Sequence, residues 1–276
     1  MSEKTSGDNN SNTSSEKTEN IIQLKSSKDD LKVKVTASVS LQMMSKHSDK
    51  HYRCACLCTQ SCVEIEGTYH KGEDEKIQSE KYQKDQALAT GSIMSIVAYL
   101  ETTINEFFSD CITKSGNFPN FSKIDESIIE NLVNYWNQTD NRGIYKNRWK
   151  TILERYLDVY KIIKGKGLHY PSKYYEDVNA LIDLRNILVH YEPKWQHGKP
   201  HFDDPYGINR LDGKFSYNKF REDSGNPFFP YKCLGAGCSK WAIVISENFV
   251  KEFFSNIDVD PVFFKVEEIR KEILGS

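Results

Sequence analysis

The sequence predicts a mainly helical protein with a small β appendage near its N-terminus. Two observations carry this prediction. After residue 82 the apolar residues recur at steps of three and four, which is typical of amphipathic helices packed against one another. Over residues 31–42 they alternate at every second position instead, which is typical of a half-buried strand.

Length and charge narrow the function classes. At 276 residues the chain can form one large domain, or one domain with appendages. Its 37 basic and 39 acidic residues nearly cancel, so any nucleic-acid site must be a local patch. No apolar run approaches ~18 residues, and we expect no membrane contact. The first 20 residues hold no apolar signal segment, so the seven cysteines are expected to be reduced in the cytoplasm.

The N-terminal region is predicted to have two parts. Residues 1–30 are rich in Ser, Asn, Lys, Glu and Asp, which indicates a disordered tail. Residues 31–70 are predicted to form a β-hairpin, with strict alternation over 31–42 and a second strand from about His51 to Glu66. A lone two-stranded ribbon is barely stable in water, so the hairpin must pack on the helices or pair with another chain.

The rest of the chain, 82–276, is predicted to be a helical domain. Apolar periodicity marks six helical segments, at 82–111, 124–136, 149–163, 172–191, 241–253 and a short stretch near the C-terminus. Gly165 is expected to end the third of these, and Ser172 to start the fourth. A long loop rich in Gly, Pro, Asp and aromatic residues fills 193–236.

The fourth predicted helix carries the chemistry-bearing segment Arg185-Asn186-Ile187-Leu188-Val189-His190, shortly before Pro193. Arginine among aliphatic residues is costly unless it is paired, and histidine is the usual proton-transfer side chain near neutral pH. Together they indicate acid–base chemistry on a phosphate. The structural alternative is that Arg185 pairs with a carboxylate between two helices, while His190 caps the helix C-terminus, where a cation is favoured.

The helical geometry separates the two side chains. On an ideal helix His190 shares a polar stripe roughly 60° wide with Asn179, Asp183 and Asn186, and aliphatic residues lie on both flanks. Arg185 projects about 140° away from His190. Its long side chain can carry the guanidinium past apolar neighbours, and Glu192 before Pro193 is biased away from helical geometry.

The segment from Arg185 to His190 resembles the R-x4-6-H motif of the HEPN superfamily. These domains are small helical bundles, and many are metal-independent ribonucleases of toxin and antiviral systems. An Asn directly after the Arg and aliphatic spacers are common in that family, and residues 98–106 resemble its first long helix. The resemblance covers roughly residues 82–257, so it leaves 1–70 and the long loop unexplained.

The resemblance implies an endoribonuclease that acts as a homodimer, with the motif helices of two chains facing each other. The ribose 2′-hydroxyl would attack the adjacent phosphate to give a 2′,3′-cyclic phosphate, which requires no metal or cofactor. His190 would act as general base or acid, and Arg185 would hold the phosphate. Asn186 would orient the imidazole or contact the phosphate.

Further residues are predicted to bind RNA, and other functions stay open. By resemblance, Glu101 and Asn105 reach the same cleft; the alternative for each is a solvated edge. Lys166 and Lys173 belong to a basic, aromatic segment suited to single-stranded RNA, or to a solvated turn. A regulatory protein or antitoxin is a further expected partner. The alternative function is a non-catalytic HEPN-like module for dimerisation or for binding a partner or nucleotide.

Four cysteines raise the question of a metal. Cys54, Cys56, Cys58 and Cys62 lie close together, but zinc ligands usually come in pairs spaced C-x2-4-C. Along a strand, thiols two residues apart are about 6.6 Å from each other, too far for one tetrahedral ion unless the strand bends. Small buried side chains are therefore favoured, and metal binding by these cysteines stays open.

Overall fold

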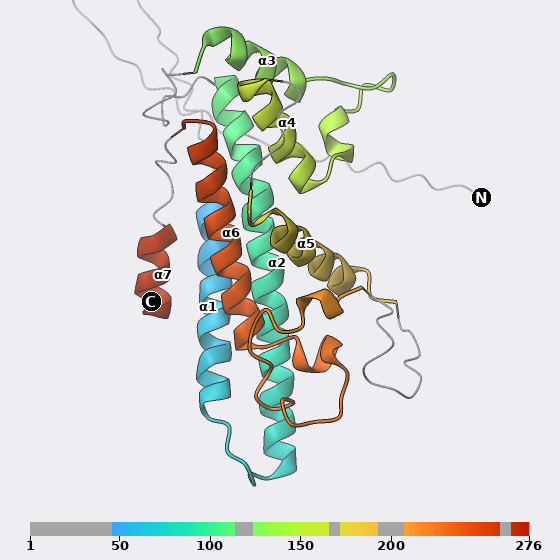
Figure 1. Ribbon diagram of the computed structural model, residues 1–276, viewed down its shortest axis with the longest axis vertical. Coiled ribbons are helices and arrows are strands. Elements are labelled where there is room, and N and C mark those ends of the chain that lie inside the picture. The colour runs from blue at the N-terminus through green and yellow to red at the C-terminus, as the bar shows by residue number, and fades with distance from the viewer. Residues whose placement is uncertain (1–45, 114–123, 166–171, 193–206, 260–265, 276) are drawn as a thin grey trace, which may run out of the picture. The chain divides into compact units, whose positions relative to one another are not determined.

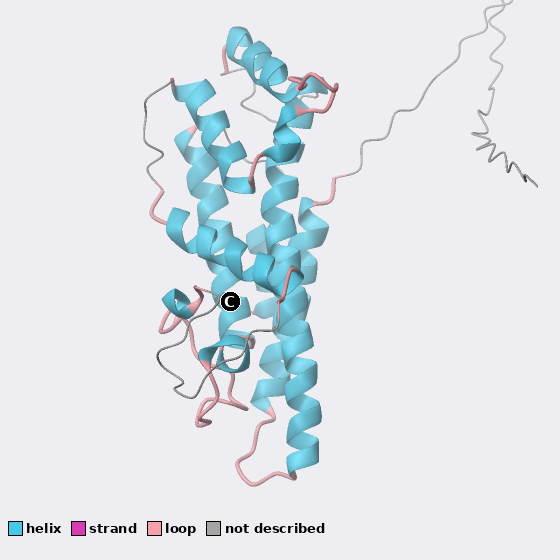
Figure 2. Ribbon diagram, turned by 90° about the vertical axis from the view of Figure 1, so that its right-hand side faces the viewer, coloured by secondary structure: helices cyan, strands magenta, loops and turns pink. Residues whose placement is uncertain are grey.

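The computed structural model describes residues 46–113, 124–165, 172–192, 207–259 and 266–275, and these contain helices and no strand (Figures 1 and 2). The α-helices are α1 (Ser48–Gly67), α2 (Glu75–Thr113), α3 (Glu126–Trp136), α4 (Ile152–Lys164), α5 (Tyr175–Val189), α6 (Ala236–Asn256) and α7 (Val266–Leu274). Short helical turns are η2 (Lys146–Trp149), η3 (Asn209–Leu211) and η4 (Phe228–Lys232). The prediction of a mainly helical protein is confirmed, whereas an HEPN bundle remains a prediction.

The β-hairpin prediction is wrong where the structure describes that segment. The expected second strand, His51 to Glu66, lies within α1. The buried residues of α1 recur with helical spacing and are Ser48, Tyr52, Ala55, Cys56, Thr59, Cys62 and Glu66. Most of them are small or polar, so they escape a search for aliphatic periodicity. The expected tail 1–30 and first strand 31–42 lie outside the described residues.

Helix α2 is the central element, because it packs against α1, α3, α4, α5 and α6. Figure 1 shows α1 and α6 running alongside it. By length and composition alone α2 could also cross a bilayer, and half of its apolar window is buried inside the protein. In this fold the apolar surface of α2 is explained by packing, because each neighbouring helix covers part of it.

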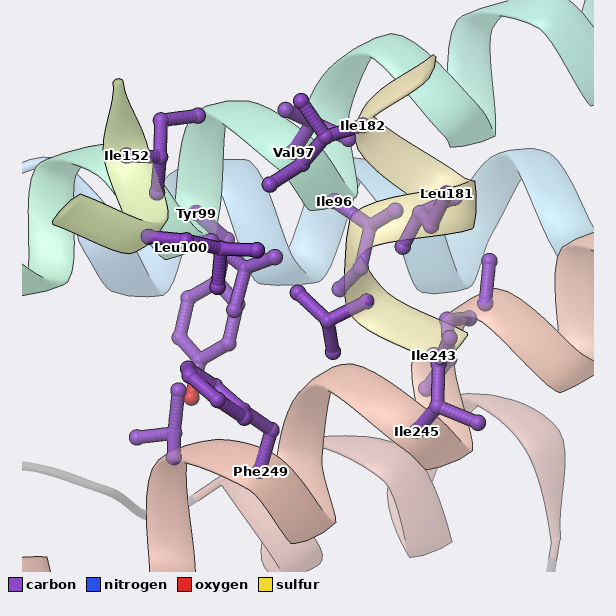
Figure 3. Close-up of a cluster of buried hydrophobic side chains, with 14 of the residues drawn as sticks. Ile96, Val97, Tyr99, Leu100, Ile152, Leu181, Ile182, Ile243, Ile245 and Phe249 are labelled. Carbon is purple, nitrogen blue, oxygen red and sulfur yellow. The ribbon is translucent and has the colours of Figure 1, made fainter. Parts of the chain in front are cut away.

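The core fixes where α4 and α5 lie on α2. The Tyr156 hydroxyl of α4 donates to the Leu100 carbonyl of α2 at 2.8 Å, and its ring lies edge-on to Phe253 of α6 with centroids 4.7 Å apart. Figure 3 shows Leu181 and Ile182 of α5 beside Ile96 and Val97 of α2. Packing therefore anchors the middle of α5, and Ile187 and Leu188 of its last turn are partly buried against the same core.

The carboxylate of Glu106, on α2, caps the N-terminus of α1. Glu106 accepts hydrogen bonds from the main-chain N–H groups of His47 and Ser48, at 2.6 and 3.0 Å, and from the Ser48 hydroxyl at 2.6 Å. Its charge also lies at the positive end of the α1 dipole.

We expect Glu106→Gln to lower the free energy of unfolding by about 1 kcal/mol, because the amide keeps one acceptor oxygen but loses the charge. Urea titration followed by circular dichroism measures this. Glu80→Gln, on an exposed part of the same helix, is the matched control and should change little. Equal stability of the two variants would show that Glu106 does not stabilise α1.

Candidate functional site

The predicted motif occupies the end of α5. Leu181 and Leu184 of this helix are fully buried, Arg185 is half-buried, and Asn186 and His190 are exposed. The helix ends at Val189, and His190 is the C-cap residue, with its main-chain N–H donating to the Asn186 carbonyl at 2.8 Å. The bias imposed by Pro193 thus coincides with the end of the helix, and the imidazole lies in solvent.

The guanidinium of Arg185 is unusual for its lack of protein partners. Its Nε is shielded from solvent and has no hydrogen-bond partner, and the described residues provide no ion pair to this side chain. The expected alternative, a carboxylate holding Arg185 between two helices, is therefore not found among them. Asp183, two residues earlier, pairs with Arg210 instead. A partly buried cation without a partner is costly, and it is the kind of group that an incoming anion or second chain can satisfy.

The motif side chains do not contact one another within the described chain. No hydrogen bond joins the side chains of Arg185, Asn186 and His190 there. This agrees with their directions on the helix, which place Arg185 about 140° from His190.

Glu101 and Asn105, which were predicted to join the motif, contact a different arginine. Arg155 of α4 donates through Nη1 to Glu101 Oε1 at 3.1 Å and to Asn105 Oδ1 at 2.9 Å. Its Nη2 donates to the Lys150 carbonyl at 3.3 Å. Arg155 lies in the first turn of α4, which begins with a capping box. Thr151 Oγ1 accepts from the Glu154 N–H at 3.3 Å, and Glu154 Oε2 accepts from the Thr151 N–H at 2.6 Å.

These residues line a cavity of about 230 Å³. Its lining comes from three regions of the sequence and consists of Glu101, Asn105, Trp136, Tyr145, Asn147 and Arg155. Asn147 is buried and donates from Nδ2 to the Trp136 carbonyl at 3.2 Å, which ties η2 to the end of α3. Sequence reasoning missed Arg155, although the capping-box pattern Thr151-x-x-Glu154 was visible.

Of the two lysines predicted to bind RNA, the structure describes only Lys173. Lys166 lies outside the described residues. Lys173 is exposed just before α5, and its ammonium lies 4.8 Å from the centroid of the Tyr174 ring. The prediction that Ser172 starts this helix is wrong, because α5 begins at Tyr175 with Tyr174 as its N-cap, and the Ser172 hydroxyl accepts from the Tyr174 N–H at 3.2 Å in the turn before it. An RNA contact by Lys173 stays a prediction.

The four clustered cysteines lie on a helix and not on a strand. Cys56 and Cys62 are fully buried, whereas Cys54 is exposed and accepts a hydrogen bond from Ser95 Oγ at 3.3 Å. In the described part of the chain, no group of three or more His, Cys, Asp and Glu residues is arranged to hold a metal ion. Because they lie on α1, these thiols do not have the separation of about 6.6 Å that a strand would give them.

A buried carboxyl pair was not predicted at all. Glu66 of α1 and Asp85 of α2 are 4% and 0% exposed. Glu66 accepts from the Ala236 N–H at 2.8 Å, which caps α6, and Asp85 accepts from Asn218 Nδ2 at 2.5 Å. Burial, aided by the charge of Glu66, raises the pKa of Asp85 to about 7, and burial also raises the pKa of Glu66.

The chain fits tightly around this pair. A Cβ on Gly235 would lie 2.5 Å from Glu66 Oε1 and 3.1 Å from Asn218 Cβ, so a larger residue there would force these buried side chains to shift. Two carboxyls so placed cannot both be charged at low cost.

No family model, curated protein or solved structure matches the chain. The similarity of Arg185–His190 to the HEPN motif therefore remains a prediction from those residues. The described residues define only a broad class: a mainly helical protein in which one helix ends with an arginine and a histidine, and which has a separate polar cavity.

Proposed function

We propose that this protein is a metal-independent endoribonuclease of the HEPN type, with Arg185, Asn186 and His190 as its catalytic residues. The observation that carries the proposal is the half-buried guanidinium of Arg185, which no described residue neutralises. An RNA phosphate provides the missing negative charge, and the planar guanidinium can bind two of its oxygens.

The chemistry needs a proton carrier and a charge stabiliser. The 2′-oxygen forms a bond to phosphorus, the bond from phosphorus to the 5′-oxygen breaks, and a proton moves from the first oxygen to the second. The exposed imidazole of His190 can take or give that proton. Arg185 stabilises the charge that develops on the phosphate, and Asn186 orients the imidazole or binds a phosphate oxygen. DNA lacks the nucleophile.

The geometry favours a site formed by two chains. Arg185 and His190 diverge by about 140° on one helix, so the proposed site pairs Arg185 of one subunit with His190 of the other. Val189 and Tyr191, on either side of His190, are 48% and 49% exposed, as expected for residues that a second copy covers. The dimer, the toxin or antiviral role, a regulatory or antitoxin partner and the cytoplasmic location all belong to this proposal.

One observation favours a second candidate, a non-catalytic module that binds a partner or a nucleotide. Arg155 holds Glu101 and Asn105 in their own cavity, so these residues do not contact the motif in the described chain. Such a module uses the cavity and leaves His190 without a chemical role.

Cleavage in the presence of EDTA separates the two candidates. We expect purified protein to cut single-stranded RNA into fragments with 2′,3′-cyclic phosphate and 5′-hydroxyl ends, which mass spectrometry identifies. Single-stranded DNA of the same sequence is the control and should stay intact. Intact RNA, or fragments with 5′-phosphate ends, would contradict the proposal and favour the binding module.

A further inference from the structure

The cavity beside Arg155 combines a fixed aromatic wall with polar groups. One face of the Trp136 ring stacks on Phe108 of α2, with centroids 4.3 Å apart and ring planes 26° from parallel. The same Trp136 lines the cavity together with the ring of Tyr145, which is 49% exposed. An oriented indole next to a solvent-facing phenol provides a surface on which a planar ligand can stack.

Glu101 and Asn105 provide a hydrogen-bond acceptor and a hydrogen-bond donor in this cavity. Arg155 occupies Glu101 Oε1 and Asn105 Oδ1, so Asn105 must turn its amide nitrogen away from the guanidinium. Among the described residues, neither Glu101 Oε2 nor Asn105 Nδ2 has a hydrogen-bond partner. The Glu101 side chain is 40% exposed, whereas that of Arg155 is only 10% exposed. Arg155 therefore holds both side chains in place, with a carboxylate acceptor and an amide donor open to a ligand.

The chain around the cavity is basic and aromatic. Trp149 of η2 is 69% exposed and Lys146 is exposed in the same segment, whereas Arg142 pairs with Asp140 at 2.9 Å. An indole this exposed is unusual unless it meets a partner. Stacking rings interleaved with cations are what single-stranded nucleic acids and nucleotides require.

We propose that this cavity binds one unstacked nucleobase, with guanine preferred. The guanine N1–H and N2–H groups donate to Glu101, and its O6 accepts from Asn105 Nδ2. The cavity volume of about 230 Å³ suits one heterocycle, with the sugar and phosphate left outside near Lys146. The base can come from RNA or from a free nucleotide. This inference deepens the second candidate, the nucleotide-binding module, and does not rest on the proposed nuclease activity, because binding of ligands that cannot be cleaved tests it.

Isothermal titration calorimetry tests the proposal on the full chain. The ligands are GMP, AMP, CMP and UMP, and two hexadeoxynucleotides, one of thymines alone and one with a single guanine. We expect GMP or the guanine-containing hexamer to bind at least roughly tenfold more tightly than its counterparts. Preference in the mononucleotides alone assigns a free nucleotide, and preference in the hexamers alone assigns a base within a strand. Equal affinity across both sets, or no binding, would overturn the proposal.

Glu101→Gln is the decisive variant, because the amide oxygen can still accept from Arg155 while the carboxylate is lost. We expect it to weaken guanine binding by roughly 10–100-fold. Glu130→Gln, an exposed position on α3, is the matched control and should bind as the unmodified protein does. If Glu101→Gln fails to fold, Tyr145→Ala removes the exposed ring and should weaken binding in its place. Unchanged affinity in the folded variant would overturn the assignment.

Discussion

Substitution of His190 by alanine is expected to slow RNA cleavage by roughly 10²–10⁴-fold, the usual contribution of a general acid or base. Its side chain is exposed and makes no hydrogen bond to a described residue, so its loss should not disturb the fold. The bond that closes α5 comes from the main-chain N–H of residue 190 and survives in the alanine variant. Single-turnover cleavage in EDTA measures the effect.

His70→Ala is the matched control, because His70 is another exposed histidine and lies in the turn between α1 and α2. It should cleave at the unmodified rate. Equal rates for His190→Ala and His70→Ala would mean that the activity comes from another residue or from a contaminating nuclease.

The second large effect concerns stability. Asp85→Asn is expected to raise the free energy of unfolding at pH 8 by an amount of the order of 2–4 kcal/mol. The pKa of Asp85 is about 7 in the folded protein, against about 3.9 in an unfolded chain. Between these values the folded state binds more protons than the unfolded state. The contribution of Asp85 to the free energy of unfolding therefore falls as pH rises from about 4 to about 7.

Asparagine at this position removes the ionisation and keeps the contacts. Its carbonyl can accept from Asn218 Nδ2, and its amide can donate to Glu66, the other titratable side chain of the pair. Urea titrations at pH 4.5, 6 and 8 should show the free energy of unfolding of Asp85→Asn rising relative to that of the unmodified protein as the pH rises. Asp223→Asn, an 80% exposed position, should reproduce the unmodified profile. Parallel profiles for all three proteins would contradict a raised pKa at Asp85.

Most of the helices could be predicted because their buried residues are aliphatic or aromatic and recur at helical spacing. Gly165, predicted to end a helix, is the C-cap of α4 with φ of 105°, a conformation that favours glycine. Helix α1 could not be predicted in this way, because it buries Cys56, Thr59 and Glu66 where most helices bury larger aliphatic residues. Its Cys54-Ala55-Cys56 segment also imitates strand alternation.

The candidate sites were predicted only as far as local sequence allows. The position of Arg185 and His190 at a helix end follows from periodicity and Pro193. The contact of Glu101 and Asn105 with Arg155 depends on how α4 packs on α2, across 50 or more residues. The Glu66–Asp85 pair likewise requires α1 and α2 to be antiparallel neighbours. It could not be predicted because the segment of α1 was assigned as a strand.

Our central claim is that Arg185 of one chain and His190 of another form one RNA-cleaving site, and mixing two inactive variants tests it most directly. Arg185→Ala and His190→Ala are each expected to be inactive. In a dimer with sites shared between subunits, random re-pairing of the two should restore roughly one quarter of the unmodified activity, since half of the dimers hold one intact site. No recovery from a mixture whose exchange of subunits is demonstrated would contradict a shared site.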